Sequence, residues 1–247
     1  MALFEAKDLH LRFGDRVVLE NVSLAFEAGQ LSGIMGPNGA GKTTCFNVLT
    51  GRYKPDRGQV LWQGEDITGR SPQAIARLGI ARSFQLMNLF DEFSVFENIA
   101  IALPQTRARS RNMVREAYAD AALVDEAHAI LKRVGLAERA GDEAKSLPYG
   151  ARRALEIGVA LACRPKLLFL DEPTAGLGSD GRARLAELIL KLKGSVTIVI
   201  IEHDMEFLFS LADRISVIHW GQVIAKGTPA ALKANPWVEA SNLGRLN

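Results

Sequence analysis

The sequence predicts an α/β fold with three parts: a parallel-sheet core, an N-terminal antiparallel β subdomain and an inserted α-helical subdomain. Two observations predict the core. A glycine-rich loop follows a short apolar segment at residues 31–35, and longer apolar segments occupy residues 166–172 and 196–201. Buried parallel strands have this continuous apolar character. The third observation is the lack of strand-like alternation between residues 86 and 158, which predicts the helical insert.

The composition is that of a globular protein. The chain has 247 residues, 48% of them hydrophobic, and a formal net charge of +2. Apolar runs such as Val196–Ile201 are far shorter than the roughly 20 residues that span a bilayer. The N-terminal sequence MALFEAKDLHLRF contains acidic residues and no apolar stretch, so we expect no signal peptide. Cys45 and Cys163 are too few for a disulfide framework or a metal cluster, which favours a reducing, cytosolic setting.

Residues 36–43, GPNGAGKT, fill every fixed position of the phosphate-binding loop G-x-x-x-x-G-K-[ST]. Glycines let successive backbone N–H groups approach phosphate oxygens. Lys42 supplies a charge for the β- and γ-phosphates, and Thr43 a hydroxyl for Mg²⁺. The helix predicted from Thr43 to Gly51 adds the positive end of its dipole. We therefore predict binding of a nucleoside triphosphate by Gly36, Pro37, Asn38, Gly39, Ala40, Gly41, Lys42, Thr43 and Thr44.

Short alternating segments within residues 2–28 predict strands joined by a turn at Gly14-Asp15, and residues 58–64 predict another. These strands form the predicted β subdomain. Phe13 lies just before the turn, and its periodicity alone favours a buried position in the strand core.

A helix should begin at Ser71 and Pro72, which suit the N-cap and the first helical position, and should end at Gly79. Residues 80–84 should then return to the sheet and leave Gln85 at its exit.

In the helical insert, Ser94 and Glu97 fit a capping box, and residues 113–134 predict one long helix stopped by Gly135. We interpret an arginine cluster in this region as a solvated loop and helix start, with a membrane-facing or partner-facing patch as the alternative. The cluster consists of Arg107, Arg109, Arg111 and Arg115.

The segment KLLFLDE ends in Asp171 and Glu172. Ligands of open α/β sheets lie at the carboxyl ends of the strands. Asp171 can hold Mg²⁺ through water, and Glu172 can polarise an attacking water. The alternative is an acidic pair that caps a helix. The next strand brings His203 to the same edge, where we expect it to contact the γ-phosphate.

The last part of the chain, ADRISVIHWGQVIAKG, predicts a hairpin. Thr228 and Pro229 then predict the start of a final helix that ends before Asn235 and Pro236.

These motifs resemble one family, the ATP-binding subunit of ABC transporters, over nearly the whole chain. GPNGAGKTT resembles its Walker A loop, Gln85 its Q-loop, LPYGA its signature, LLFLDEP its Walker B and His203 its H-loop. Phe13 falls where the family places the aromatic ring that stacks on adenine, which replaces the strand-core interpretation. The details LPYG, DEPTAGL and IEHDM look most like the Liv-type subunit of branched-chain amino acid importers.

The resemblance implies a P-loop NTPase fold with a RecA-like core, in one ABC ATPase domain over residues 1–247. The core with its β subdomain would be residues 1–85 and 159–230, the helical subdomain 86–158, and the C-terminal helix and tail 231–247.

The resemblance also implies ATP hydrolysis with Mg²⁺. Glu172 would be the general base, His203 and Gln85 would sense the γ-phosphate, and Lys42 would neutralise charge. Thr43, Gln85 and Asp171 would hold the metal.

Two such subunits would pair head to tail, with each ATP between Walker A of one copy and the signature of the other. The helical subdomain would grip transmembrane permease subunits, served indirectly by a periplasmic or extracellular solute-binding protein. The chain would be peripheral, on the cytoplasmic face of a bacterial plasma membrane, and would not bind nucleic acid. The signature residues acting in trans would be Leu147, Pro148, Tyr149, Gly150 and Ala151.

The chain departs from the family pattern in the trans half of the site. Pro148, Tyr149 and Ala151 replace Ser, Gly and Gln of L-S-G-G-Q, and Gly178 replaces the Asp or Asn of the D-loop. Backbone N–H groups around Gly150 are left to contact the γ-phosphate.

Three other functions compete with amino-acid import. A soluble ABC ATPase acting on nucleic acid or ribosomes is disfavoured by the single Walker A and the near-neutral charge. A regulatory subunit that does not hydrolyse ATP is disfavoured by the intact Glu172 and His203. A transport motor for another cargo, such as urea, amides or lipopolysaccharide, stays open.

Overall fold

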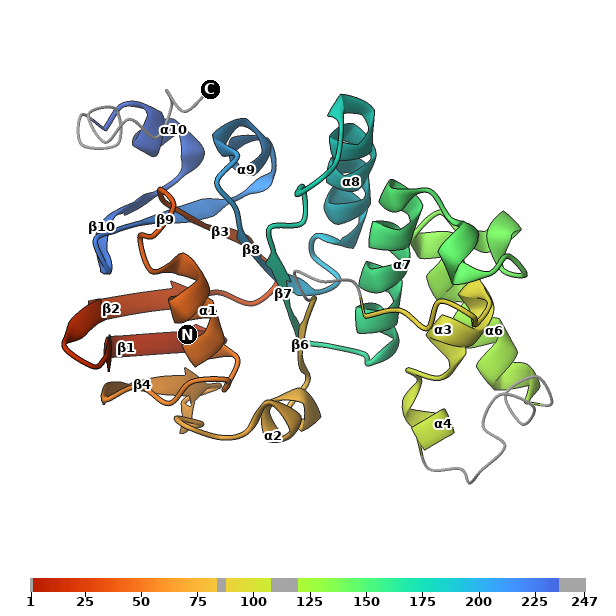
Figure 1. The fold of residues 1–247 in the computed structure, drawn as a ribbon, viewed down its shortest axis with the longest axis horizontal. Helices are drawn as coiled ribbons and strands as arrows, with labels where there is room; N and C mark the ends of the chain where they lie inside the picture. Colours follow the sequence, from red (N-terminus) through yellow and green to blue (C-terminus); the bar gives the residue numbers. More distant parts are fainter. Residues whose placement is uncertain (1, 84–87, 108–119, 236–247) are drawn as a thin grey trace.

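The computed structural model describes residues 2–83, 88–107 and 120–235, and Figure 1 shows its two sheets on one side and a group of helices on the other. The strands are β1 (Phe4–Phe13), β2 (Arg16–Phe26), β3 (Leu31–Met35), β4 (Arg57–Trp62), β5 (Glu65–Asp66), β6 (Ile80–Arg82), β7 (Leu167–Asp171), β8 (Thr197–Ile201), β9 (Arg214–His219) and β10 (Gln222–Gly227). The helices are α1 (Lys42–Leu49), α2 (Pro72–Arg77), α3 (Val95–Ala100), α4 (Pro104–Arg107), α6 (Ala121–Arg133), α7 (Tyr149–Ala162), α8 (Ser179–Leu192), α9 (Met205–Leu211) and α10 (Pro229–Lys233).

The larger sheet has six strands in the order β10-β9-β3-β8-β7-β6. All neighbours pair in parallel except β10, which pairs antiparallel with β9. Every residue of β3, β7 and β8 is buried, as their continuous apolar sequences predict. The carboxyl ends of these three strands therefore meet at one edge, and that edge carries the predicted site.

The smaller sheet is antiparallel, in the order β2-β1-β4-β5. Its strands β1 and β2 have 10 and 11 residues, longer than the short strands expected, and their pairing contains register shifts. Phe169 of β7 joins the two sheets through edge-to-face contacts with Phe4 at 5.5 Å and Phe46 at 5.7 Å between ring centroids. This aromatic packing fixes the β subdomain and α1 against the parallel sheet.

Helices α3, α6 and α7 pack together on the side opposite the antiparallel sheet (Figure 1). The predicted capping box is confirmed, because Glu97 N donates to Ser94 Oγ at 3.1 Å and Ser94 N donates to Glu97 Oε2 at 2.7 Å.

The prediction of one continuous helix over residues 113–134 is wrong. Asp120 has an extended backbone and caps α6, since its Oδ1 accepts from Leu123 N at 3.2 Å. Residues 113–119 and the arginine cluster, apart from the backbone of Arg107 at the end of α4, lie outside the described residues. Among the helices described, none combines the length and apolar character needed to cross a membrane.

Candidate nucleotide site

The glycine-rich loop lies between the end of β3 and the start of α1. Gly36 must be glycine because a Cβ there would lie 2.0 Å from the Ile218 carbonyl oxygen. Gly41 is the N-cap of α1 with φ of 100°, and it provides no side-chain cap. The first N–H groups of α1 are therefore free of a side-chain acceptor at the cap, as an anion-binding helix start requires.

Lys42 is buried at the base of this loop. Its Nζ donates to the carbonyl oxygens of Gly36 at 2.7 Å and Pro37 at 2.9 Å. Burial lowers the pKa of its ammonium group, while the negative charges of Glu172, Glu202 and Asp171 raise it. The amine is thus held in the loop and faces the carboxylates at the ends of β7 and β8.

Asp171 is the last residue of β7 and is only 3% exposed. Burial and the neighbouring Glu172 raise the pKa of its carboxyl group to about 6, against the opposing effect of Arg82 and Arg153. A raised pKa means that its surroundings disfavour the ionised form.

Glu172 follows directly, with a side chain 21% exposed and a left-handed φ of 43°. Its N–H donates to the Ile201 carbonyl oxygen of β8 at 2.9 Å. Strained backbone of this kind persists only where surrounding contacts hold it, and it concentrates at functional sites.

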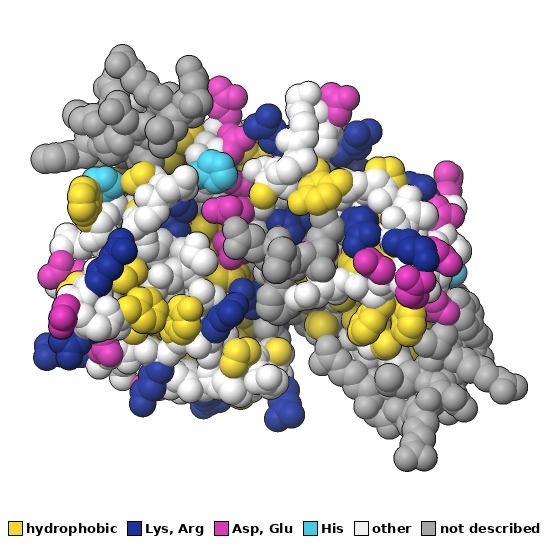
Figure 2. Space-filling model, in the orientation of Figure 1, with side chains coloured by type: hydrophobic (Ala, Val, Ile, Leu, Met, Phe, Trp, Pro, Cys, Tyr) yellow, Lys and Arg dark blue, Asp and Glu magenta, His cyan; other side chains and the backbone are white. Residues whose placement is uncertain are grey.

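His203 lies beside Glu172, with 3.9 Å between Nδ1 and Glu172 Oε1, and its side chain is 55% exposed. The preceding residue, Glu202, is fully buried and accepts hydrogen bonds from the N–H and hydroxyl of Thr174 and from His203 N. Figure 2 shows histidine side chains in the upper left part of the face, one of them next to acidic side chains. The structure therefore brings together Lys42, Asp171, Glu172 and His203, as the sequence predicts.

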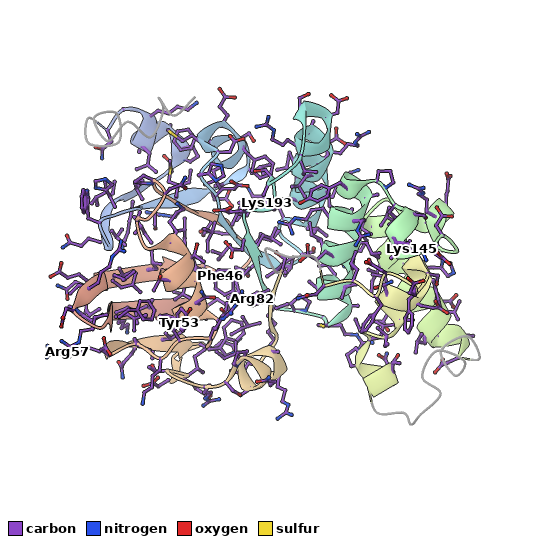
Figure 3. All side chains as sticks on the ribbon, in the orientation of Figure 1. Phe46, Tyr53, Arg57, Arg82, Lys145 and Lys193 are labelled. Atoms are coloured by element: carbon purple, nitrogen blue, oxygen red, sulfur yellow. The ribbon has the colours of Figure 1, made fainter. Side chains whose placement is uncertain are left out.

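Sequence reasoning did not identify Glu202, Arg82 or Arg153 as parts of the site. The guanidinium carbon of Arg82, in β6, lies 4.6 Å from the centroid of the Phe46 ring, and the Arg82 Nη1 donates to Thr50 Oγ1 at 2.9 Å (Figure 3). The sequence contains a weak signal for two of these residues, because Glu202 directly follows the apolar strand β8 and Arg82 is the last residue of the short strand β6.

Phe13, at the end of β1, is 49% exposed, so the strand-core interpretation is wrong. The rings of Phe13 and Tyr53 pack edge to face with 5.4 Å between their centroids, so Tyr53 supports one side of the Phe13 ring.

The segment LPYGA leads into α7, which begins at Tyr149 with Pro148 as N-cap. Gly178 is the N-cap of α8, and a Cβ added there meets no atom within 4 Å. Gln85 lies outside the described residues.

A family model described as "ABC transporter" matches residues 19–175, more than half of the chain. The chain belongs to the ABC transporter family. It is an ATP-binding subunit of that family, with the ATPase activity that such subunits have.

Two relatives of this ABC subunit are similar along their whole length. The chain is 39% identical to the high-affinity branched-chain amino acid transport ATP-binding protein LivG of Escherichia coli (strain K12), over 98% of each chain. It is also 39% identical to BraF of Pseudomonas aeruginosa, a protein with the same description, again over 98% of each chain.

Among solved structures, the fold is similar to the crystal structure of the ADP conformation of MJ1267, an ATP-binding cassette of an ABC transporter. The TM-score is 0.86 at 29% sequence identity, covering 99% of this chain and 100% of that one. The P-loop NTPase fold with its β subdomain is confirmed by this likeness.

The oxygen donors of this ABC subunit fit Mg²⁺. The ion prefers hard oxygen ligands and keeps several waters and phosphate oxygens. The described residues contain no cluster of three or more His, Cys, Asp or Glu suited to a metal. The Thr43 hydroxyl and the Asp171 carboxylate would instead contribute alongside nucleotide and water. A divalent cation would also favour the ionised form of Asp171, which its surroundings disfavour.

Proposed function

We propose that this chain is the ATP-hydrolysing subunit of an importer for branched-chain or other amino acids. The observation that carries the proposal is full-length similarity to LivG and BraF, whose names give branched-chain amino acid transport. The LPYG, DEPTAGL and IEHDM segments of this chain, which resemble the Liv-type subunit, support the same cargo class.

In the proposed reaction, water attacks the γ-phosphorus of ATP, and the bond to the β–γ bridging oxygen breaks so that ADP and phosphate are released. The loop of residues 36–44 holds the phosphates, and Lys42 neutralises charge as it develops. Mg²⁺, when bound through Thr43, Asp171 and Gln85, supplies further charge neutralisation. Glu172 takes the proton from the attacking water, and His203 with Gln85 contacts the γ-phosphate. The 3.9 Å between His203 and Glu172 supports the assignment of both to one reacting centre.

For the assembly we propose a head-to-tail pair of ATP-binding subunits on the cytoplasmic face of a bacterial plasma membrane. Residues 147–151 of one copy would cover the nucleotide of the other. The helical subdomain of residues 86–158 would contact the permease subunits, which take solute from a separate solute-binding protein. Closure on ATP would thus drive a conformational change in the permease.

Uptake measurements test the cargo. A strain lacking the gene should lose uptake of radiolabelled leucine, and the wild-type gene should restore it, whereas a Glu172→Gln gene should not. Unchanged leucine uptake together with lost uptake of labelled urea or an amide would contradict the amino-acid assignment and leave the ATPase assignment standing.

The adenine contact gives a separate prediction. Phe13→Ala should weaken ATP binding about tenfold, because stacking of a base on an aromatic ring contributes about 1–3 kcal/mol. Phe13→Tyr should bind normally. Calorimetry with inorganic triphosphate is the control, since that ligand has no base and should bind wild type and Phe13→Ala equally. Equal loss for both ligands would show that Phe13 acts on the loop and not on adenine.

A further inference from the structure

Arg153 is a charged side chain that the fold buries almost completely, at 2% exposure. It lies in α7, within the first turns after the signature segment of residues 147–151. Arginine is almost never fully buried unless it is paired. Here Arg153 Nη1 donates to Glu156 Oε2 at 2.6 Å, so the ion pair lies within one helix.

The same guanidinium holds the backbone that follows β7. Its Nη2 donates to the carbonyl oxygens of Asp171 at 3.3 Å and Glu172 at 2.9 Å, and its Nε donates to that of Pro173 at 3.2 Å. A guanidinium carries five N–H donors in a rigid fork, which suits it to several carbonyl groups at once. These carbonyls belong to the segment that carries the proposed general base.

Arg153 therefore acts on a strained residue. Glu172 has a φ of 43°, which a residue with a side chain adopts only where its surroundings enforce it. Its N–H is fixed by the Ile201 carbonyl oxygen, and its own carbonyl oxygen accepts from Arg153 Nη2 at 2.9 Å and from Ala175 N at 3.1 Å. Contacts on both sides thus set the direction in which the Glu172 side chain leaves the backbone.

Helix α7 touches the same loop a second time through the signature. The Tyr149 hydroxyl donates to the Ala175 carbonyl oxygen at 3.1 Å. Its ring lies over Gly176, where an added Cβ would be 3.1 Å from Tyr149 Cε1. One helix thus carries the segment expected to face the partner's ATP and two side chains that hold its own catalytic loop.

We propose that Arg153 is a positioning residue that connects the signature helix to Glu172 of the same chain. The inference rests on the proposed function, and it adds regulation of that site. When residues 147–151 engage ATP across the dimer, the movement of α7 reaches the Glu172 backbone through the guanidinium. Hydrolysis of the ATP held by one chain's Walker A loop then depends on whether the signature of that same chain is engaged with the ATP held by its partner.

The test compares two variants that change Arg153 with one control variant. The double variant Arg153→Met/Glu156→Leu removes the guanidinium and also the buried Glu156 carboxylate, because loss of one member of a buried ion pair would destabilise the fold. Arg153→Lys retains a charge but lacks the fork. The control is Arg164→Met, which removes the same type of side chain beyond the far end of α7, where Arg164 pairs with Glu126 at the surface.

We expect the double variant to lose at least tenfold in kcat for ATP, while KM and calorimetric ADP affinity stay within about twofold. Arg153→Lys should give an intermediate kcat, and Arg164→Met should match wild type. This separation of kcat from KM is specific for positioning, because a general structural defect would weaken nucleotide binding as well.

A folded double variant with wild-type kcat would overturn the inference, and so would parallel losses of kcat and ADP affinity. If the double variant does not fold, Arg153→Lys decides by the same criteria. A wild-type chain that binds ATP without hydrolysing it would instead refute the proposed function itself, and the inference with it.

Discussion

Glu172→Gln should reduce kcat for ATP by about 10²- to 10⁴-fold, the range that a general base contributes. Glutamine keeps the size of the side chain and the backbone contacts of Glu172 to Ile201 and Arg153, so the geometry survives while the proton acceptor is lost. ATP affinity should remain within about twofold, because Lys42 and the loop hold the phosphates. Steady-state kinetics and calorimetry measure the two quantities separately.

The same variant reports on the dimer. With hydrolysis blocked, Mg-ATP should convert the protein from monomer to dimer in sedimentation. This result would mean that Pro148, Tyr149, Ala151 and Gly178 still complete a working trans site. Tight ATP binding without dimerisation would instead indicate a paralogous partner that supplies a better signature.

The matched control is Glu65→Gln, the same substitution at an exposed position of β5. It should leave kcat unchanged. Retained hydrolysis in Glu172→Gln would remove Glu172 from the role of general base.

Asp171→Asn should stabilise the nucleotide-free protein at pH 7 and weaken its function. The pKa of Asp171 is about 6 in the folded chain and 3.8 ordinarily, a difference that corresponds to about 3 kcal/mol. Because the folded value is higher, the stabilisation from binding a proton is complete below about pH 4 and is lost as the pH rises through about 6. Asparagine resembles the protonated form and avoids this loss.

Urea unfolding without nucleotide measures the effect. The variant should be more stable than wild type at pH 7, and the difference should shrink as the pH falls toward 4. The apparent affinity for Mg²⁺ in ATP hydrolysis should fall about 10- to 100-fold, as is usual for residues that hold a metal through its bound water or other ligands.

Asp66→Asn is the matched control, because the pKa of Asp66 is lowered in the folded chain whereas that of Asp171 is raised. Hydrogen bonds from Thr68 lower the pKa of Asp66, so its ionised form is favoured in the folded chain. The substitution at this exposed position should not stabilise the protein at pH 7. A destabilised Asp171→Asn would show that the carboxylate has a structural role that outweighs its burial.

Local signals in the sequence predicted much of this fold. The glycine loop, the apolar runs of β3, β7 and β8, and the caps at Ser71, Ser94 and Thr228 all involve residues within a few positions of one another. Steric and hydrogen-bonding rules at that range need no knowledge of the rest of the chain. The one clear error among the helices, at Asp120, arose because helical periodicity outweighed a capping residue.

The site was predictable to the extent that strand ends define it. Lys42, Asp171, Glu172 and His203 each lie at or just beyond the end of a recognisable element, so parallel pairing of β3, β7 and β8 was enough to bring them together. The sequence, read with the family pattern that it resembles, was therefore sufficient to predict the positions of these residues.

Only the tertiary structure decided how those residues are held. The guanidinium of Arg153 reaches carbonyl groups 18 to 20 residues away in the chain, and Thr174 donates to Glu202 28 residues away. The half-exposed ring of Phe13 and the raised pKa of Asp171 likewise depend on elements packed from elsewhere. Burial and desolvation are properties of the whole packed chain, so local sequence cannot supply them.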